Sequence, residues 1–114
     1  MTFNELDLKR IDRIVGGLCR RRTRPDLADQ LRLDYEIDGQ SVVVFEERPD
    51  WRDATQCMRT PVAKLRFVRT TGLWTLYWRR ADLKWHRYQP AGPTVDLGAM
   101  VEIIDRDEYC AFFG

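Results

Sequence analysis

The sequence predicts an α+β fold: an antiparallel meander sheet of about five strands, with N- and C-terminal helices packed on one face. Apolar residues recur at helical spacing near both ends of the chain, whereas alternating β-branched and aromatic runs fill its middle. Turn signals separate those runs, the clearest being Asp38-Gly39 and Thr71-Gly72. The 114 residues, 44% of them hydrophobic, suffice for one domain, residues 1–114, with its own core.

The helices are expected at the two ends. Residues 5–22 read as an amphipathic helix, for which Asn4 is a suitable N-cap and Asp7 stands at the capping-box position. The pair Gly16-Gly17, each costing about 1 kcal/mol in a helix interior, predicts a close-packing notch or a kink. Near the other end, Asp96 can cap a last helix. Its inner face would carry Leu97, Met100, Val101 and Ile104.

A first hairpin is expected around Asp38-Gly39, between residues 31–37 and residues 41–48. A two-residue turn there would pair Tyr35 with Val42. The second strand is apolar on both faces at its centre, unlike its neighbour.

Residues 49–61 are polar and bracketed by prolines, so we expect a long connection with Trp51 as its anchor. A third strand follows at residues 62–70. The turn Thr71-Gly72 then leads into a fourth strand, residues 73–80. A further reversal would start the fifth strand.

The turn assignments set the register and thereby the faces of the sheet. A reversal of the chain at Ala81-Asp82 would pair the fourth strand with the fifth. The expected pairs are Leu65 with Trp78, Trp78 with Trp85, and Tyr77 with His86. One face would then be the core face, covered by both helices, and gather Leu65, Phe67, Trp74, Leu76, Trp78 and Trp85. The other would face solvent and gather Lys64, Arg66, Tyr77, Arg79, Lys84, His86 and Tyr88.

The net charge of +1 conceals alternating blocks along the chain. Residues 1–25 carry +4 and residues 26–60 carry −5; residues 61–90 carry +6 and residues 91–114 carry −4. These blocks can neutralise one another across the fold. A concentrated positive segment can instead attract an anionic partner, because local fields rather than net charge steer association.

The solvent-facing set therefore suggests a nucleic-acid-binding module. Its aromatic members could stack on bases while its cations meet phosphates. The binding residues would be Lys64, Arg66, Tyr77, Arg79, Lys84, His86 and Tyr88. The alternative reading is an ordinary solvated sheet face, on which tyrosine, lysine and arginine are common. No base-reading motif decides between the two.

Two other classes of function remain open. A non-catalytic homodimer or protein-interaction module could use Val43, Phe45, Val68 and Tyr77 of the same face. A small hydrolase or nuclease-like enzyme is the third option, with His86 as general acid or base beside Asp82 or an acid of the first hairpin. The only serine, Ser41, lacks the GxSxG pattern, and Cys57 has no recognisable base partner. We therefore expect no catalytic residues.

Composition also bears on cofactor, compartment and partner. One histidine and three scattered cysteines favour neither a metal site nor a disulfide framework, and no cofactor is expected. The cysteines fit a reducing cytoplasm. The polar start and the lack of a long apolar run predict no membrane association. The aromatic end should dock on the core through Phe112 and Phe113.

The runs FNELDLKRID, PVAKLRFVRT and LYWRRADLKWHRY, followed by a terminal FFG, together resemble a family of small bacterial proteins. That family is catalogued as Domain of Unknown Function 3024. The resemblance covers essentially the whole chain and implies a bacterial, stand-alone, single-domain protein. It implies no activity and carries over no catalytic or binding residues.

Overall fold

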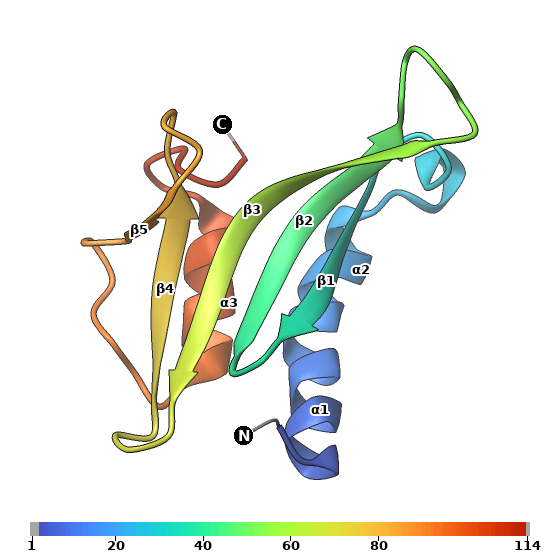
Figure 1. The fold of residues 1–114 in the computed structure, drawn as a ribbon. Coiled ribbons are helices and arrows are strands. Elements are labelled where there is room, and N and C mark those ends of the chain that lie inside the picture. Colours follow the sequence, from blue (N-terminus) through green and yellow to red (C-terminus); the bar gives the residue numbers. More distant parts are fainter. Residues whose placement is uncertain (1–2, 114) are drawn as a thin grey trace.

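A computed structural model describes residues 3–113 and shows an α+β fold. The five strands form one antiparallel sheet in chain order, with helical segments before and after it (Figure 1). The elements are α1 (Glu5–Ile11), a π-helical segment (Asp12–Gly16), α2 (Gly17–Arg22), a 3-10 turn (Pro25–Leu27), β1 (Arg32–Asp38), β2 (Ser41–Pro49), β3 (Cys57–Val68), β4 (Leu73–Arg79), β5 (Trp85–Arg87) and α3 (Leu97–Arg106).

The N-terminal helix begins as predicted. The Asn4 side chain accepts the Asp7 N–H at 2.8 Å, and the Asp7 carboxylate accepts the Asn4 N–H, which completes a capping box. The helix is interrupted by the π-helical segment, which ends at Gly16. A Cβ on Gly16 would lie 2.8 Å from Asp12 Oδ1, so the glycine leaves room for that carboxylate, which accepts the Tyr35 hydroxyl at 2.8 Å. The close-packing notch predicted at Gly16 therefore accommodates the Asp12 carboxylate.

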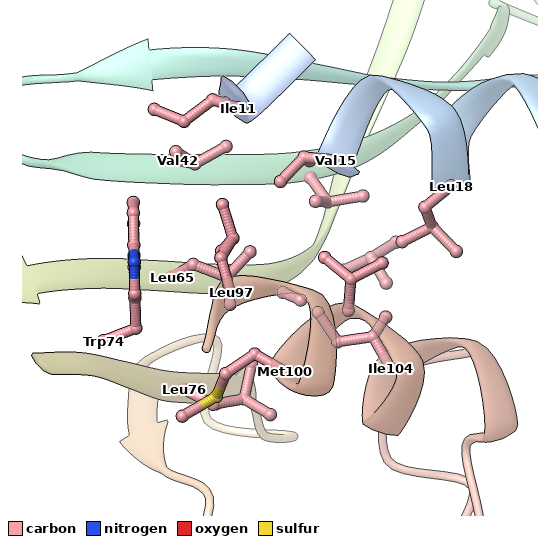
Figure 2. Packing of buried hydrophobic residues seen from close by; sticks show 14 of the residues in the cluster. Ile11, Val15, Leu18, Val42, Leu65, Trp74, Leu76, Leu97, Met100 and Ile104 are labelled. Atoms are coloured by element: carbon pink, nitrogen blue, oxygen red, sulfur yellow. The ribbon is translucent and has the colours of Figure 1, made fainter. Parts of the chain in front are cut away.

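Both helical regions pack on one face of the sheet (Figure 2). This face is the inner face, and the opposite one is the open face. The core is formed by apolar side chains from both helical regions and the three central strands, each at most 2% exposed. They include Ile11, Val15, Leu18, Val42, Leu65, Leu76, Leu97, Met100 and Ile104.

The aromatic end of the chain docks on this core, as predicted. Phe112 is buried and its ring lies 5.0 Å from that of Tyr88. Asp107 ends α3 in a left-handed conformation, and its carboxylate accepts the N–H groups of Phe112 and Phe113 at 2.9 and 2.8 Å. The Arg22 guanidinium covers the Phe113 ring at 3.7 Å.

The first two hairpins keep their predicted faces but not their predicted pairs. Tyr35 pairs with Val44 instead of Val42, because Gly39, at φ +59°, occupies the first turn position. Leu65 pairs with Leu76 instead of Trp78, because four residues rather than two connect β3 to β4. Each shift amounts to two positions, and a shift of two returns every side chain to the same side.

The predicted connection over residues 49–61 is too long. β2 continues to Pro49 and β3 already begins at Cys57, so the connection covers only residues 50–56. Trp51 is 85% exposed, so it does not anchor the connection on the core. The extra strand pairs, such as Glu46–Thr60 and Glu47–Arg59, are mostly polar and show no apolar alternation in the sequence. An ion pair between Arg59 and Glu47 accompanies the ladder there.

In the last hairpin the observed register differs from the predicted one by an odd number of positions, so the side chains of β5 lie on the faces opposite to those predicted. Tyr77 pairs with Arg87, Trp78 with His86 and Arg79 with Trp85, so the predicted pairs Trp78–Trp85 and Tyr77–His86 are wrong. Five residues separate Arg79 from Trp85, and an odd number inverts the alternation that a two-residue turn implies. Leu83 adopts a left-handed φ of +63° within this connection.

Candidate nucleic-acid interface

The open face carries one row of neighbouring side chains across all five strands. The register aligns Glu36, Val43, Lys64, Tyr77 and Arg87. Acidic residues dominate the β1 end of this face, whereas basic and aromatic residues dominate the end formed by β3, β4 and β5. We call the latter set the basic half: Lys64, Arg66, Tyr77, Arg79, Trp85 and Arg87.

Ion pairs are distributed unevenly among the cations. Within residues 3–113, no ion pair involves Lys64, Arg66, Arg79 or Arg87 of the basic half. Arginines that form ion pairs lie in the N-terminal helical region and its turns, on β1 and β2, in the connection after β2, at the start of β3 and on α3. They include Arg20, Arg21, Arg22, Arg24, Arg32, Arg48, Arg52, Arg59 and Arg106.

Two glutamates of the open face, Glu36 and Glu47, are already engaged by arginines. Glu47 accepts from Arg32 and from Arg59, each at 2.9 Å, and Arg59 also lies 3.3 Å from Glu36. Burial tends to raise the pKa of Glu47, but the two guanidinium groups outweigh it and hold the pKa below its ordinary value. Glu47 therefore stays ionised and paired with arginines. In the part of the chain that the structure describes, neither Glu36 nor Glu47 forms an ion pair with the basic half.

A hollow of about 350 Å³ lies at one end of the basic half, next to the turn after β4. Arg59, Arg79 and Arg80 line it together with Thr60 and Leu83. Arg79 Nε is buried and has no hydrogen-bond acceptor among the described residues. Arg59 is already paired with Glu36 and Glu47, so Arg79 and Arg80 are the arginines here that suit phosphate oxygens.

Four of the predicted binding residues lie together as expected. Lys64 and Tyr77 are half-buried neighbours on adjacent strands, Arg66 is exposed, and Arg79 is half-buried beside the hollow. Lys84 is exposed but belongs to the connection before β5. The open face thus retains the core of the predicted set.

The remaining two predicted residues are on the other side of the sheet. His86 pairs with Trp78, and Tyr88, only 4% exposed, packs among core aromatic rings, so neither shares the open face. Their places are taken by Trp85 and Arg87, which the sequence reasoning assigned to the core or left out. The signal that identifies them is the odd length of the β4–β5 connection.

His86 has an acid partner but no nucleophile. Its Nε2 lies 2.7 Å from Asp82 Oδ2, and the Lys84 N–H together with His86 lowers the pKa of Asp82. No hydrogen bond links His86 to Ser41 or to a cysteine within residues 3–113. The same range contains no cluster of three or more His, Cys, Asp or Glu side chains that could hold a metal ion.

The apolar patch proposed for dimerisation is smaller than the sequence suggests. Phe45 is 4% exposed, and the Arg59 guanidinium covers its ring at 4.6 Å. Val43, Val68 and Tyr77 are half-buried. The largest apolar member of the patch is therefore not available to a partner.

No helix within residues 3–113 is long and apolar enough to cross a membrane. No curated protein and no solved structure matches the chain. One family, described as Domain of unknown function (DUF3024), matches residues 3–114, in agreement with the resemblance seen in the sequence. The chain belongs to the DUF3024 family.

Proposed function

We propose that this protein is a non-enzymatic module that binds single-stranded nucleic acid on the basic half of its open sheet face. The observation that carries the proposal is the combination of four cations without acid partners and two aromatic rings on one uncovered face. A single strand presents both phosphates and unstacked bases, which such a surface can contact at the same time.

The division of labour follows from residue type. Tyr77 and Trp85 are partly exposed and offer ring faces for base stacking, which depends little on base identity. Lys64, Arg66 and Arg87 offer charges for the backbone. The hollow beside Arg79 supplies a place for one phosphate. Binding of this kind is sensitive to salt and tolerant of sequence.

The proposal extends to the compartment and source. Cys19, Cys57 and Cys110 are all free thiols, which suits the reducing cytoplasm of a bacterial cell. Nucleic acid is accessible there to a protein of this kind.

The test is a titration of labelled single-stranded and duplex oligonucleotides at several salt concentrations, followed by fluorescence anisotropy. We expect binding that weakens linearly in log–log form with salt and favours the single strand. A double variant, Lys64→Ala with Arg66→Ala, should weaken binding at least about tenfold in low salt. Binding to neither oligonucleotide at low salt contradicts the proposal.

The matched control removes two positive charges elsewhere. Arg48 and Arg106 are exposed and paired with Glu46 and Glu102, respectively. The double variant Arg48→Ala with Arg106→Ala has the same net charge as the test variant and should bind like the wild type. An equal loss in both double variants would mean that overall charge, and not this face, attracts the oligonucleotide.

A further inference from the structure

A second hollow, of about 320 Å³, lies between β5 and the C-terminal tail. Trp78, Tyr88 and Tyr109 line it with aromatic rings, and Arg80 and His86 add basic groups. Trp78, His86 and Tyr88 belong to the inner side of the sheet, so the aromatic wall of this hollow is distinct from the open face. Arg87 of the basic half also lines the hollow. We call it the aromatic pocket.

The pocket combines a buried floor with an exposed rim. Tyr88 is 4% exposed, and its ring meets Trp78 edge-on at 6.4 Å and Phe112 at 5.0 Å. Tyr109, by contrast, is 66% exposed although it is a large ring. An exposed tyrosine above a wall of packed rings leaves an aromatic surface without a partner, and a planar ligand would cover it.

The tail that carries this rim is held in place by specific contacts. Asp107 turns the chain after α3 at φ +46°, and its carboxylate holds the N–H groups of Phe112 and Phe113. Cys110 also adopts a left-handed φ, +55°, and donates its N–H to the Asp107 carbonyl at 3.0 Å. Left-handed non-glycine residues are uncommon, so two in four residues indicate a closely specified path for Tyr109.

The charge of the pocket favours an anion. The Arg80 guanidinium lies 5.5 Å from the Trp78 ring centroid and forms no ion pair within residues 3–113. His86 contacts Asp82 through Nε2 at 2.7 Å. The tail acids Asp107 and Glu108 do not line the hollow. Arginine over an aromatic ring combines a stacking surface with a donor fork that matches phosphate.

We propose that the aromatic pocket binds a nucleotide, defined chemically as an aromatic base that carries a phosphomonoester. Trp78 and Tyr109 contact the base, and Arg80 with His86 contacts the phosphate. The ligand is either a free mononucleotide or the phosphorylated end of a strand, since both present this chemistry. The inference goes beyond the function proposed for the open face, because Trp78, His86, Tyr88 and Tyr109 are not part of the basic half. Arg80 and Arg87 border both sites.

The test uses adenosine 5′-monophosphate, adenosine and inorganic phosphate as probes in separate titrations. Binding is followed by nuclear magnetic resonance of the tryptophan indole N–H groups, of which Trp78 should shift and Trp51 should not. The expected order of affinity is the monophosphate first, with adenosine and phosphate each at least about fivefold weaker. No shift with the monophosphate, or equal binding by phosphate alone, overturns the inference.

A pair of variants ties the signal to the pocket. Tyr109→Ala removes an exposed ring and should weaken monophosphate binding at least about fivefold. The matched control is Trp51→Ala: Trp51 is 85% exposed and also has an arginine, Arg52, over its ring at 5.6 Å, but it lies in the β2–β3 connection. Equal losses in both variants contradict the pocket assignment.

The same reagents separate this inference from the proposed function. The Lys64→Ala, Arg66→Ala variant should keep its affinity for the monophosphate while it loses the oligonucleotide. If the protein binds the oligonucleotide but not the monophosphate, the pocket inference is wrong and the open-face proposal stands. If it binds the monophosphate but not the oligonucleotide, the open-face proposal is wrong and the pocket inference stands. Tighter binding of a 5′-phosphorylated strand than of its 5′-hydroxyl form identifies a strand end as the ligand, and equal binding identifies the free mononucleotide.

Discussion

Trp78 and His86 lie opposite each other across β4 and β5. This pairing places His86 on the inner side of the sheet, next to the C-terminal tail, and puts Trp85 and Arg87 on the open face. The open face thereby gains one ring and one cation, and the inner side gains the histidine of the aromatic pocket. The register of β5 thus distributes residues 77–88 over two candidate binding surfaces, which Arg80 and Arg87 both border.

The stability of two tyrosine variants tests this register. Tyr88→Ala should lower the free energy of unfolding by about 3 to 5 kcal/mol, because it removes a buried ring from the core. Tyr77→Ala on the open face should cost about 1 kcal/mol, a value typical of a cross-strand pair. Urea denaturation of both variants measures the difference. Similar losses would contradict the assignment of Tyr88 to the core.

Base stacking on the open face can be tested apart from charge. Tyr77→Leu keeps an apolar side chain but removes the ring, so oligonucleotide binding should weaken at least about fivefold. The slope of log Kd against log salt should stay unchanged, because no phosphate contact is lost. Anisotropy titrations at four salt concentrations give both quantities. An unchanged affinity would exclude Tyr77 as a stacking platform.

The contribution of Asp82, in the connection before β5, to the free energy of unfolding should decrease in acid. The N–H of Lys84 and the His86 ring hold the pKa of Asp82 below its ordinary value of 3.8, so the ionised carboxylate stabilises the folded state. This contribution is present above pH 3.8 and is lost as the pH falls through the lower folded-state pKa. The stability difference between wild type and Asp82→Ala should therefore shrink in acid. Urea denaturation between pH 3 and 7 measures it; a constant difference is the opposing result.

Asp107 should control the docking of the tail. Asp107→Ala removes both acceptors for the Phe112 and Phe113 N–H groups and places alanine in a left-handed conformation. Hydrogen exchange at those two amides should accelerate at least about tenfold, because each lost bond contributes roughly 1 kcal/mol or more. Asp107→Asn retains one acceptor oxygen and tolerates the backbone conformation, so its exchange should fall in between. Unchanged protection in both variants would show that aromatic packing alone holds the tail.

Side-chain patterns along the sequence are sufficient to predict the helices and strands and most of the sheet faces. Helical spacing located both terminal helices, and Asn4 and Asp96 act as the caps that their residue types predict. The first two hairpins kept their faces although their pairs moved, because each shift was even. Lys64, Arg66, Tyr77 and Arg79 were therefore assigned to the correct side.

Two features could not be predicted from side-chain patterns: which side chains of β5 lie on each face of the sheet, and how far β3 extends toward its N-terminal end. The connection around Leu83 contains an odd number of residues. It is closed by backbone hydrogen bonds, such as that from the Leu83 N–H to the Arg80 carbonyl at 2.8 Å, and an alternation pattern does not reveal these bonds. The polar start of β3 shows no apolar periodicity, since backbone hydrogen bonds and ion pairs such as Arg59–Glu47 hold it. Local side-chain patterns predict burial. Whether a connection holds an odd or an even number of residues, and which ion pairs form between strands, is determined only when the strands pair.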